Sequence, residues 1–124
     1  MAPRDAMRAS AAQFVEPGET IEQVLGAQTT SPVTAPLIGA VIALIINRYR
    51  IVAVTDRRIL VLDAGKWTPR TARAVVAELP RATRLGPASG LCTRIETPAG
   101  KIYVRRYFFK DVKAADRLMA PDLG

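Results

Sequence analysis

Two short apolar runs that flank four polar residues constrain the fold of this chain most strongly. Ile51–Val54 and Ile59–Leu62 consist of aliphatic and mostly β-branched side chains, and only residues 55–58 separate them. Two such runs joined by a short polar turn are typical of two strands in a β-hairpin. The sequence therefore predicts an antiparallel pair in the middle of the chain.

The turn itself consists of Thr55, Asp56, Arg57 and Arg58. Short polar side chains such as those of Thr55 and Asp56 bond to neighbouring amides in turns. An adjacent arginine can pair with Asp56 or with a carboxylate on an adjoining strand while its stem covers apolar surface. The favoured interpretation of Arg57 and Arg58 is therefore structural, and anion binding by either one is the alternative.

Similar short runs continue along the chain, each ended by Gly, Pro or polar residues. In the last hairpin Ile102 and Val104 alternate with Lys101 and Tyr103, which is the period of a sheet with one solvent-exposed face. The sequence predicts a mainly β fold of about seven antiparallel strands. Besides the central hairpin, the expected strands are 19–28 (with a helix as the alternative), 74–79, 81–85, 91–97 and 101–108.

The C-terminal part changes to a helical period. Asp111 is a suitable cap for a helix over residues 112–119, in which Val112, Ala115 and Met119 form one apolar stripe. This predicts a single C-terminal helix that packs on the sheet or at the mouth of a barrel.

An apolar segment at residues 35–46 has twelve residues without a charge. A helix that crosses a bilayer needs about 20 apolar residues, so this segment is too short to span one. Three interpretations remain open: a buried core element, a segment that dips into one leaflet, and a contact between subunits. In the second, the flanking arginines meet headgroups and a tyrosine lies at the interface. The candidate binding residues are Leu37, Ile38, Val41, Ile42, Ile45, Arg48, Tyr49 and Arg50.

Two motifs resemble the signature of bacterial pleckstrin-homology-like (PH-like) domains. Glu16-Pro-Gly-Glu19 precedes the first expected strand, and Val54-Thr-Asp-Arg-Arg-Ile-Leu-Val61 contains the Thr-Asp-Arg-Arg turn between two early strands. Residues 76–91 and 103–112 look similar to uncharacterised actinobacterial members. The resemblance covers about residues 16–119 and implies a split barrel of two packed, nearly orthogonal antiparallel sheets with one C-terminal helix at an open end.

This resemblance divides the chain into a flexible N-terminal lead-in at 1–15, with at most a helical turn near its end, a PH-like domain at 16–119 and a tail at 120–124. It implies an adaptor that binds lipid headgroups, peptides or proteins, because fold alone does not determine the ligand. Eukaryotic phosphoinositide binders carry clustered basic residues between the first two strands. Here that stretch is the neutral segment 29–46, followed by Arg48 and Arg50, which departs from the phosphoinositide pattern.

The net charge of +7 is concentrated in the second half of the chain. Residues 1–47 have two Arg and four acidic residues, whereas residues 48–113 have fifteen Lys or Arg and five acidic residues. A basic domain favours an anionic partner, with a solvated basic surface as the alternative. The candidate anion-binding residues are Arg57, Arg58, Lys66, Arg70 and Arg105.

The residue inventory argues against an enzyme. The chain has no histidine, the usual proton shuttle near neutral pH, and one cysteine, Cys92, so a Cys/His zinc site cannot form. We expect no metal and no cofactor. The N-terminus lacks the apolar core of a signal peptide, and the chain fits a cytoplasmic location, at the inner membrane face if it binds lipid.

Three functions are consistent with the sequence. The leading hypothesis is a non-catalytic adaptor that associates with the inner membrane surface or a protein partner through segment 35–46 and the basic residues beside it. The second is nucleic-acid binding by the basic half, which the lack of a recognition helix or an aromatic strand motif disfavours. The third is a homo-oligomeric structural protein joined through the apolar segment.

Overall fold

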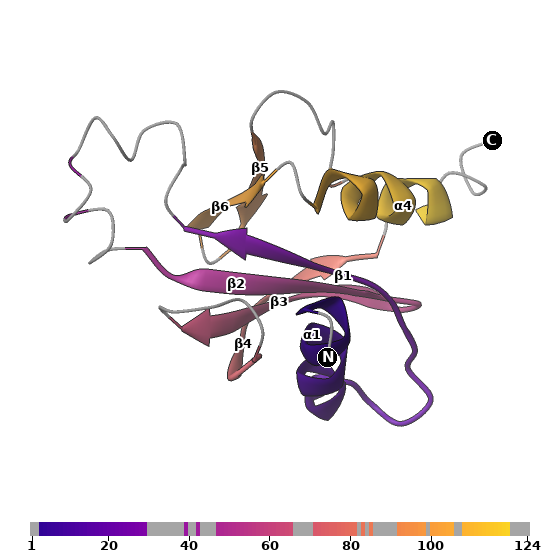
Figure 1. Cartoon of the computed structure of the whole chain (residues 1–124). Helices are drawn as coiled ribbons and strands as arrows, with labels where there is room; N and C mark the ends of the chain where they lie inside the picture. The colour runs from indigo at the N-terminus through magenta and orange to yellow at the C-terminus, as the bar shows by residue number, and fades with distance from the viewer. Residues whose placement is uncertain are drawn as a thin grey trace.

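The described part of the chain is mainly β, with six strands in one antiparallel sheet and two short α-helices (Figure 1). A computed structural model describes residues 3–29, 39, 42, 47–65, 71–81, 83, 85, 92–98, 100–105 and 108–119. The strands are β1 Ile21–Gln28, β2 Tyr49–Thr55, β3 Arg58–Gly65, β4 Ala74–Pro80, β5 Cys92–Thr97 and β6 Gly100–Arg105. The helices are α1 Pro3–Ala11, continued by a 3₁₀ turn at Ala12–Phe14, and α4 Phe109–Met119.

The strands follow the order β4-β3-β2-β1-β6-β5 in a curled sheet that forms a half-barrel. Strands β1 to β4 form a meander, and β5 and β6 form a hairpin that joins the meander where Gln28 lies opposite Tyr103. The PH-like resemblance implied two sheets, whereas the ladders of the described strands run continuously through this one junction. The edge strands β4 and β5 approach each other where the sheet curls, but no ladder joins them.

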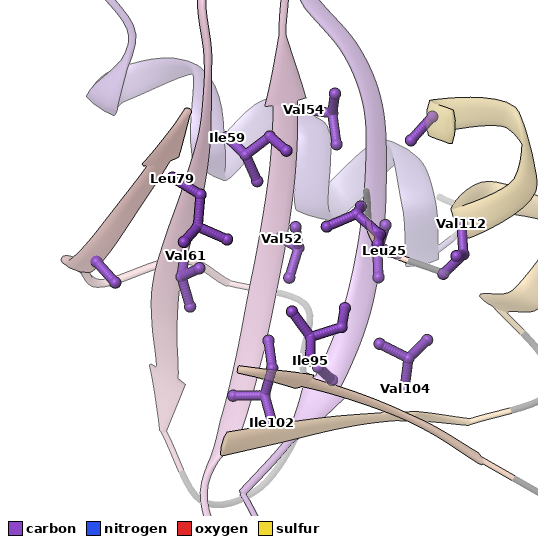
Figure 2. Close-up of a cluster of buried hydrophobic side chains, with 14 residues drawn as sticks. Leu25, Val52, Val54, Ile59, Val61, Leu79, Ile95, Ile102, Val104 and Val112 are labelled. Carbon is purple, nitrogen blue, oxygen red and sulfur yellow. The ribbon is translucent and has the colours of Figure 1, made fainter. Parts of the chain in front are cut away.

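Both faces of the sheet are buried at its centre. The inner cluster lies within the curl, where side chains from the sheet meet α4 (Figure 2). The outer cluster lies on the opposite face, beneath α1. Along β2, Val52 and Val54 point to the inner cluster while Ile51 and Ala53 point to the outer one. Burial on both faces explains why β2 and β3 are continuously apolar instead of alternating.

The N-terminal region corrects the predicted flexible lead-in. Residues 3–11 form helix α1, which lies across the sheet from α4 (Figure 1). Met7 and Ala11, four residues apart and therefore on one face of the helix, are completely buried against the sheet. A nine-residue helix is marginal by itself, so its stability comes from this packing.

A close approach between the N- and C-terminal regions depends on Gly26 in β1. A Cβ atom at this position would lie 3.0 Å from the Phe108 ring and 3.1 Å from Cε of Met7. Phe108 packs against both clusters. The missing side chain at position 26 therefore leaves the space in which Met7 and Phe108 meet the sheet.

The expected strand at 81–85 is wrong for its described residues. The Thr83 amide donates to the Pro80 carbonyl oxygen at 3.0 Å, which makes a turn directly after β4. Arg81 and Leu85 are also outside any strand. The described sheet consequently has six strands instead of the expected seven. Leu85 is buried in the inner cluster without belonging to a strand. Its backbone amide, which has no strand partner, donates instead to Asp116 Oδ1 of α4 at 2.8 Å.

The C-terminal helix is confirmed, but it begins earlier than predicted. It starts at Phe109, so Asp111 lies in its first turn and is not its cap. There the Asp111 carboxylate, only 7% exposed, accepts a bidentate pair of bonds from Arg4 of α1, the shortest at 2.8 Å. Val112 and Ala115 are buried, as the apolar stripe predicts.

Candidate binding surface at one end of the sheet

The apolar run lies in the chain between β1 and β2, and its two attachment points are bonded to each other. The Thr29 amide donates to the Arg48 carbonyl oxygen at 2.9 Å, and the Arg48 amide donates to Thr29 Oγ1 at 2.9 Å. Pairing of β1 with β2 continues up to this point, where Gln28 lies opposite Tyr49. Thr29 and Arg48, which flank the apolar run in the sequence, therefore lie side by side at one end of the sheet.

Two other connections start from the same end. Gly65 at the end of β3 lies opposite Tyr49 at the start of β2, so the chain from β3 to β4 leaves there. Strand β6 runs antiparallel to β1, and Tyr103 lies opposite Gln28. Residues before Tyr103, including Lys101 in the β5–β6 hairpin, consequently lie toward this end. We call the end defined by Thr29, Arg48 and Gly65 the loop end.

Within the apolar segment the structure describes Gly39 and Ile42. Ile42 has 54% of its surface exposed and belongs to neither hydrophobic cluster. It is one of two large hydrophobic residues that are exposed in the described part of the chain; the other is Val75 in β4. The predicted binding residues Leu37, Ile38, Val41 and Ile45 lie outside the described residues.

The basic residues beside the segment share one carboxylate. Asp63 of β3 accepts bonds from Arg48 Nε at 3.3 Å and Nη2 at 3.0 Å, and it also pairs with Arg50. The Arg48 bonds hold the pKa of Asp63 below its usual value, and the same bonds raise the pKa of Arg48. Arg48 keeps 43% of its side chain exposed, whereas Arg50 keeps 13%. The cluster has a net charge of +1, and Arg48 is its accessible member.

Tyr49 is half-buried and packs against the outer cluster. Of the three predicted binding residues that follow the apolar segment, Tyr49 and Arg50 therefore contribute mainly to the fold. Only Arg48 offers a substantial accessible surface. Asp63, which pairs with both arginines, was not among the predicted residues. The register of the central hairpin could have identified it, because a register that places Ile51 opposite Leu62 also places Arg50 opposite Asp63.

The turn between β2 and β3 lies at the opposite end of the sheet and is built from internal contacts. Thr55 Oγ1 accepts bonds from the amides of Arg57 at 3.2 Å and Arg58 at 3.0 Å, as expected of this residue type. Asp56 does not bond within the turn; its Oδ1 accepts from the Thr20 amide at 3.0 Å. Arg57 is half-exposed and lies 3.6 Å from a carboxylate oxygen of Glu16.

Arg58 is held in a partly buried ion-pair network. Its Nε lies 2.9 Å from Oε2 of Glu19 and its Nη2 lies 3.0 Å from Oε1, while Nη1 reaches Glu78 of β4 at 3.2 Å. Bonds from Arg58, and then Thr55, overcome burial and lower the pKa of Glu19 to about 2. This arrangement supports the structural interpretation of the turn, because Arg58 already has two carboxylate partners.

The remaining anion-binding candidates are not brought together by the described structure. Lys66 and Arg70 lie outside the described residues, and Arg105 is described only as part of strand β6. Arg73, which precedes β4, is exposed and lies beside Gly65 at the loop end. Lys101 is also exposed. Among the residues that the structure describes, the accessible basic side chains at this end are consequently those of Arg48, Arg73 and Lys101.

Within the described ranges, every buried side-chain nitrogen or oxygen atom has a hydrogen-bond partner. No group of His, Cys, Asp and Glu side chains in these ranges could hold a metal ion. Among the helices that the structure describes, none is both long enough and apolar enough to cross a membrane. Comparison with protein-family models, curated proteins and solved structures finds no match.

Proposed function

We propose that this chain is a non-catalytic PH-like adaptor domain that binds the anionic inner surface of a membrane through its loop end. In this proposal the apolar segment 35–46 enters the headgroup region, and Arg48 lies at the base of the segment beside lipid phosphates. The domain is cytoplasmic and peripheral. Its ordered polar side chains, such as Arg58 and Glu19, bond to each other, which favours a scaffold role over catalysis.

The observation that carries the proposal is the exposure of Ile42. This isoleucine is 54% exposed in an uncharged run whose two attachment points, Thr29 and Arg48, are bonded side by side. Full burial of such a side chain contributes about 1.5–3 kcal/mol. A contiguous exposed apolar surface marks a site that another surface covers, and in this proposal the exposure of Ile42 extends to the other apolar side chains of the segment.

Charge at the same end supports a membrane as that surface. Arg73 and Lys101 are exposed there, and the cluster of Arg48, Arg50 and Asp63 adds a net charge of +1. A basic residue near an anionic leaflet contributes about 1 kcal/mol. Insertion of apolar side chains and attraction to phosphate would therefore reinforce each other, as in other peripheral proteins that combine two weak signals.

The test is co-sedimentation of the whole chain with vesicles that contain phosphatidylglycerol and with vesicles of phosphatidylcholine alone. We expect binding to the anionic vesicles that weakens with added salt. Ile42→Asn should weaken that binding by about tenfold, because one inserted isoleucine is replaced by a polar side chain of neutral charge.

Ile42→Val is the matched control, because it keeps an apolar side chain at the same position and should bind nearly as well as the wild type. Unfolding midpoints of both variants should equal that of the wild type if position 42 lies outside the core. Wild-type protein that stays in the supernatant with both vesicle types would refute the membrane proposal. Unfolding caused by Ile42→Asn would assign the segment to the core instead.

A further inference from the structure

The two edge strands of the described sheet differ in how well they could pair with another strand. A regular edge presents a row of backbone donors and acceptors that can extend the sheet, and proteins often block such edges with bulges, proline or charge. Strand β4 is blocked: its register shifts opposite Val61 and Leu62, and the strand ends in Pro80. Val75, the exposed apolar residue of β4, lies beside this irregularity.

Strand β5 has a regular edge. Its pairing with β6 runs without a shift from Cys92, which lies opposite Arg105, to Thr97, which lies opposite Gly100. The six residues contain no proline and no glycine. No described strand pairs with the other side of β5, although β4 approaches β5 where the sheet curls.

The side chains along β5 are complementary to a second copy of the same strand. Ile95 points into the inner cluster and is 5% exposed, whereas Arg94 and Glu96 are exposed on the opposite face. Neither Arg94 nor Glu96 forms an ion pair among the described residues. Residues two apart in a strand share a face, so these opposite charges lie on either side of Ile95.

We propose that two copies of this chain associate through antiparallel pairing of their β5 edges, with a twofold axis at Ile95. In this register Arg94 of each copy lies directly opposite Glu96 of the other, which forms two cross-strand ion pairs on the outer face. The interface is isologous and closes after two subunits. The sheet then continues from one half-barrel into the next, and the inference does not depend on membrane binding.

The association should be weak, because one pair of six-residue strands makes a small interface of the transient class. The net charge of +7 on each copy also opposes it at low ionic strength. Cross-strand pairs of opposite charge contribute about 0.2–1 kcal/mol each. The monomer–dimer equilibrium should consequently be measured near physiological salt, up to millimolar protein, by sedimentation equilibrium.

Charge exchange across the twofold axis provides the decisive test. Arg94→Glu places glutamates opposite glutamates, and Glu96→Arg places arginines opposite arginines, so each variant alone should dimerise about tenfold or more weakly than the wild type. An equimolar mixture of the two variants should form a heterodimer of wild-type affinity, because each Glu then lies opposite an Arg. The double variant R94E/E96R should dimerise like the wild type.

Lys113→Glu on the exposed side of α4 is the matched control, since it changes the net charge as Arg94→Glu does and should leave the dimer intact. Amides of β5 should exchange hydrogen more slowly as wild-type protein concentration rises. A wild-type chain that stays monomeric up to millimolar concentration would overturn the proposal. So would a dimer that Arg94→Glu leaves unchanged, or one that only Ile42→Asn dissociates, which would assign the contact to the apolar segment.

Discussion

The ion pair between Glu19 and Arg58 offers the sharpest test of how this fold is held together. The Glu19 carboxylate is fully buried and accepts four bonds: two from Arg58, one from Thr55 Oγ1 at 2.6 Å and one from the Glu16 amide at 2.9 Å. Through these four bonds Glu19 connects the segment before β1 to the turn between β2 and β3. We therefore expect Glu19→Gln to lower the free energy of unfolding substantially.

The magnitude follows from what the substitution leaves behind. Removing one partner of a buried pair costs about 3–5 kcal/mol. Here Arg58 keeps Glu78 at 3.2 Å and is 20% exposed, and glutamine keeps one acceptor oxygen, so the expected loss is about 2–3 kcal/mol. Urea unfolding at neutral pH should show it as a midpoint lower by about 1–2 M with an unchanged slope.

The same contact determines a pH dependence. The pKa of Glu19 falls from 4.5 to about 2 on folding, so the folded chain binds fewer protons than the unfolded chain between these values. The resulting stabilisation is complete above about pH 4.5 and is lost as the pH falls toward 2, and it amounts to about 3 kcal/mol. Glu19→Gln should remove most of this acid dependence, because glutamine does not titrate.

Glu16→Gln is the matched control, three residues away. The Glu16 side chain is 65% exposed and lies 3.6 Å from Arg57, so its replacement should change the free energy of unfolding by less than about 0.5 kcal/mol. The reasoning is refuted if Glu19→Gln unfolds at the wild-type urea midpoint, or if it keeps the wild-type loss of stability between pH 4.5 and 2.

Two further substitutions test the packing of the terminal helices. Gly26→Ala places a Cβ 3.0 Å from the Phe108 ring and should lower the free energy of unfolding by about 1–3 kcal/mol through overpacking. An unchanged midpoint in urea unfolding would mean that Met7 and Phe108 move aside without loss of stability. Arg4→Gln leaves the Asp111 carboxylate without its bidentate partner and should lower the free energy of unfolding by about 1–3 kcal/mol. A double-mutant cycle with Asp111→Asn should show coupling between the two substitutions, and additive effects would exclude a direct contribution from the pair.

Local pattern was sufficient for most of the strands. The apolar runs on either side of residues 55–58 pair as the predicted hairpin, and Ile102 and Val104 are buried as their alternation indicates. The stripe of Val112 and Ala115 likewise faces the core. These features depend on residues close in sequence, and the spacing of such residues determines which side chains share a face of a strand or helix.

Functional inference from local pattern was less complete. The exposed arginine at the base of the apolar segment could be named from the sequence, but its carboxylate partner Asp63 required the hairpin register. The structural nature of the turn at Arg58 could be argued from residue types, whereas its main partner, Glu19, lies 39 residues away. Most of the segment that motivates the membrane proposal lies outside the described residues, so the proposal is argued from Ile42 and from the basic residues of the loop end.

The sequence by itself determined a basic, mainly β chain with a central hairpin, a last two-stranded hairpin and a C-terminal helix, because periodicity and turn chemistry act over a few residues. Only the tertiary structure decided that Pro3–Ala11 forms a helix, that residues after Pro80 turn instead of extending the sheet, and that β5 has a regular edge. The first two of these involve contacts between distant segments, because α1 packs on the outer cluster and Leu85, after the turn, donates its amide to Asp116 of α4. A helix as short as the one that contains Met7 is marginal by itself, and it is stabilised when the outer face of the sheet buries Met7.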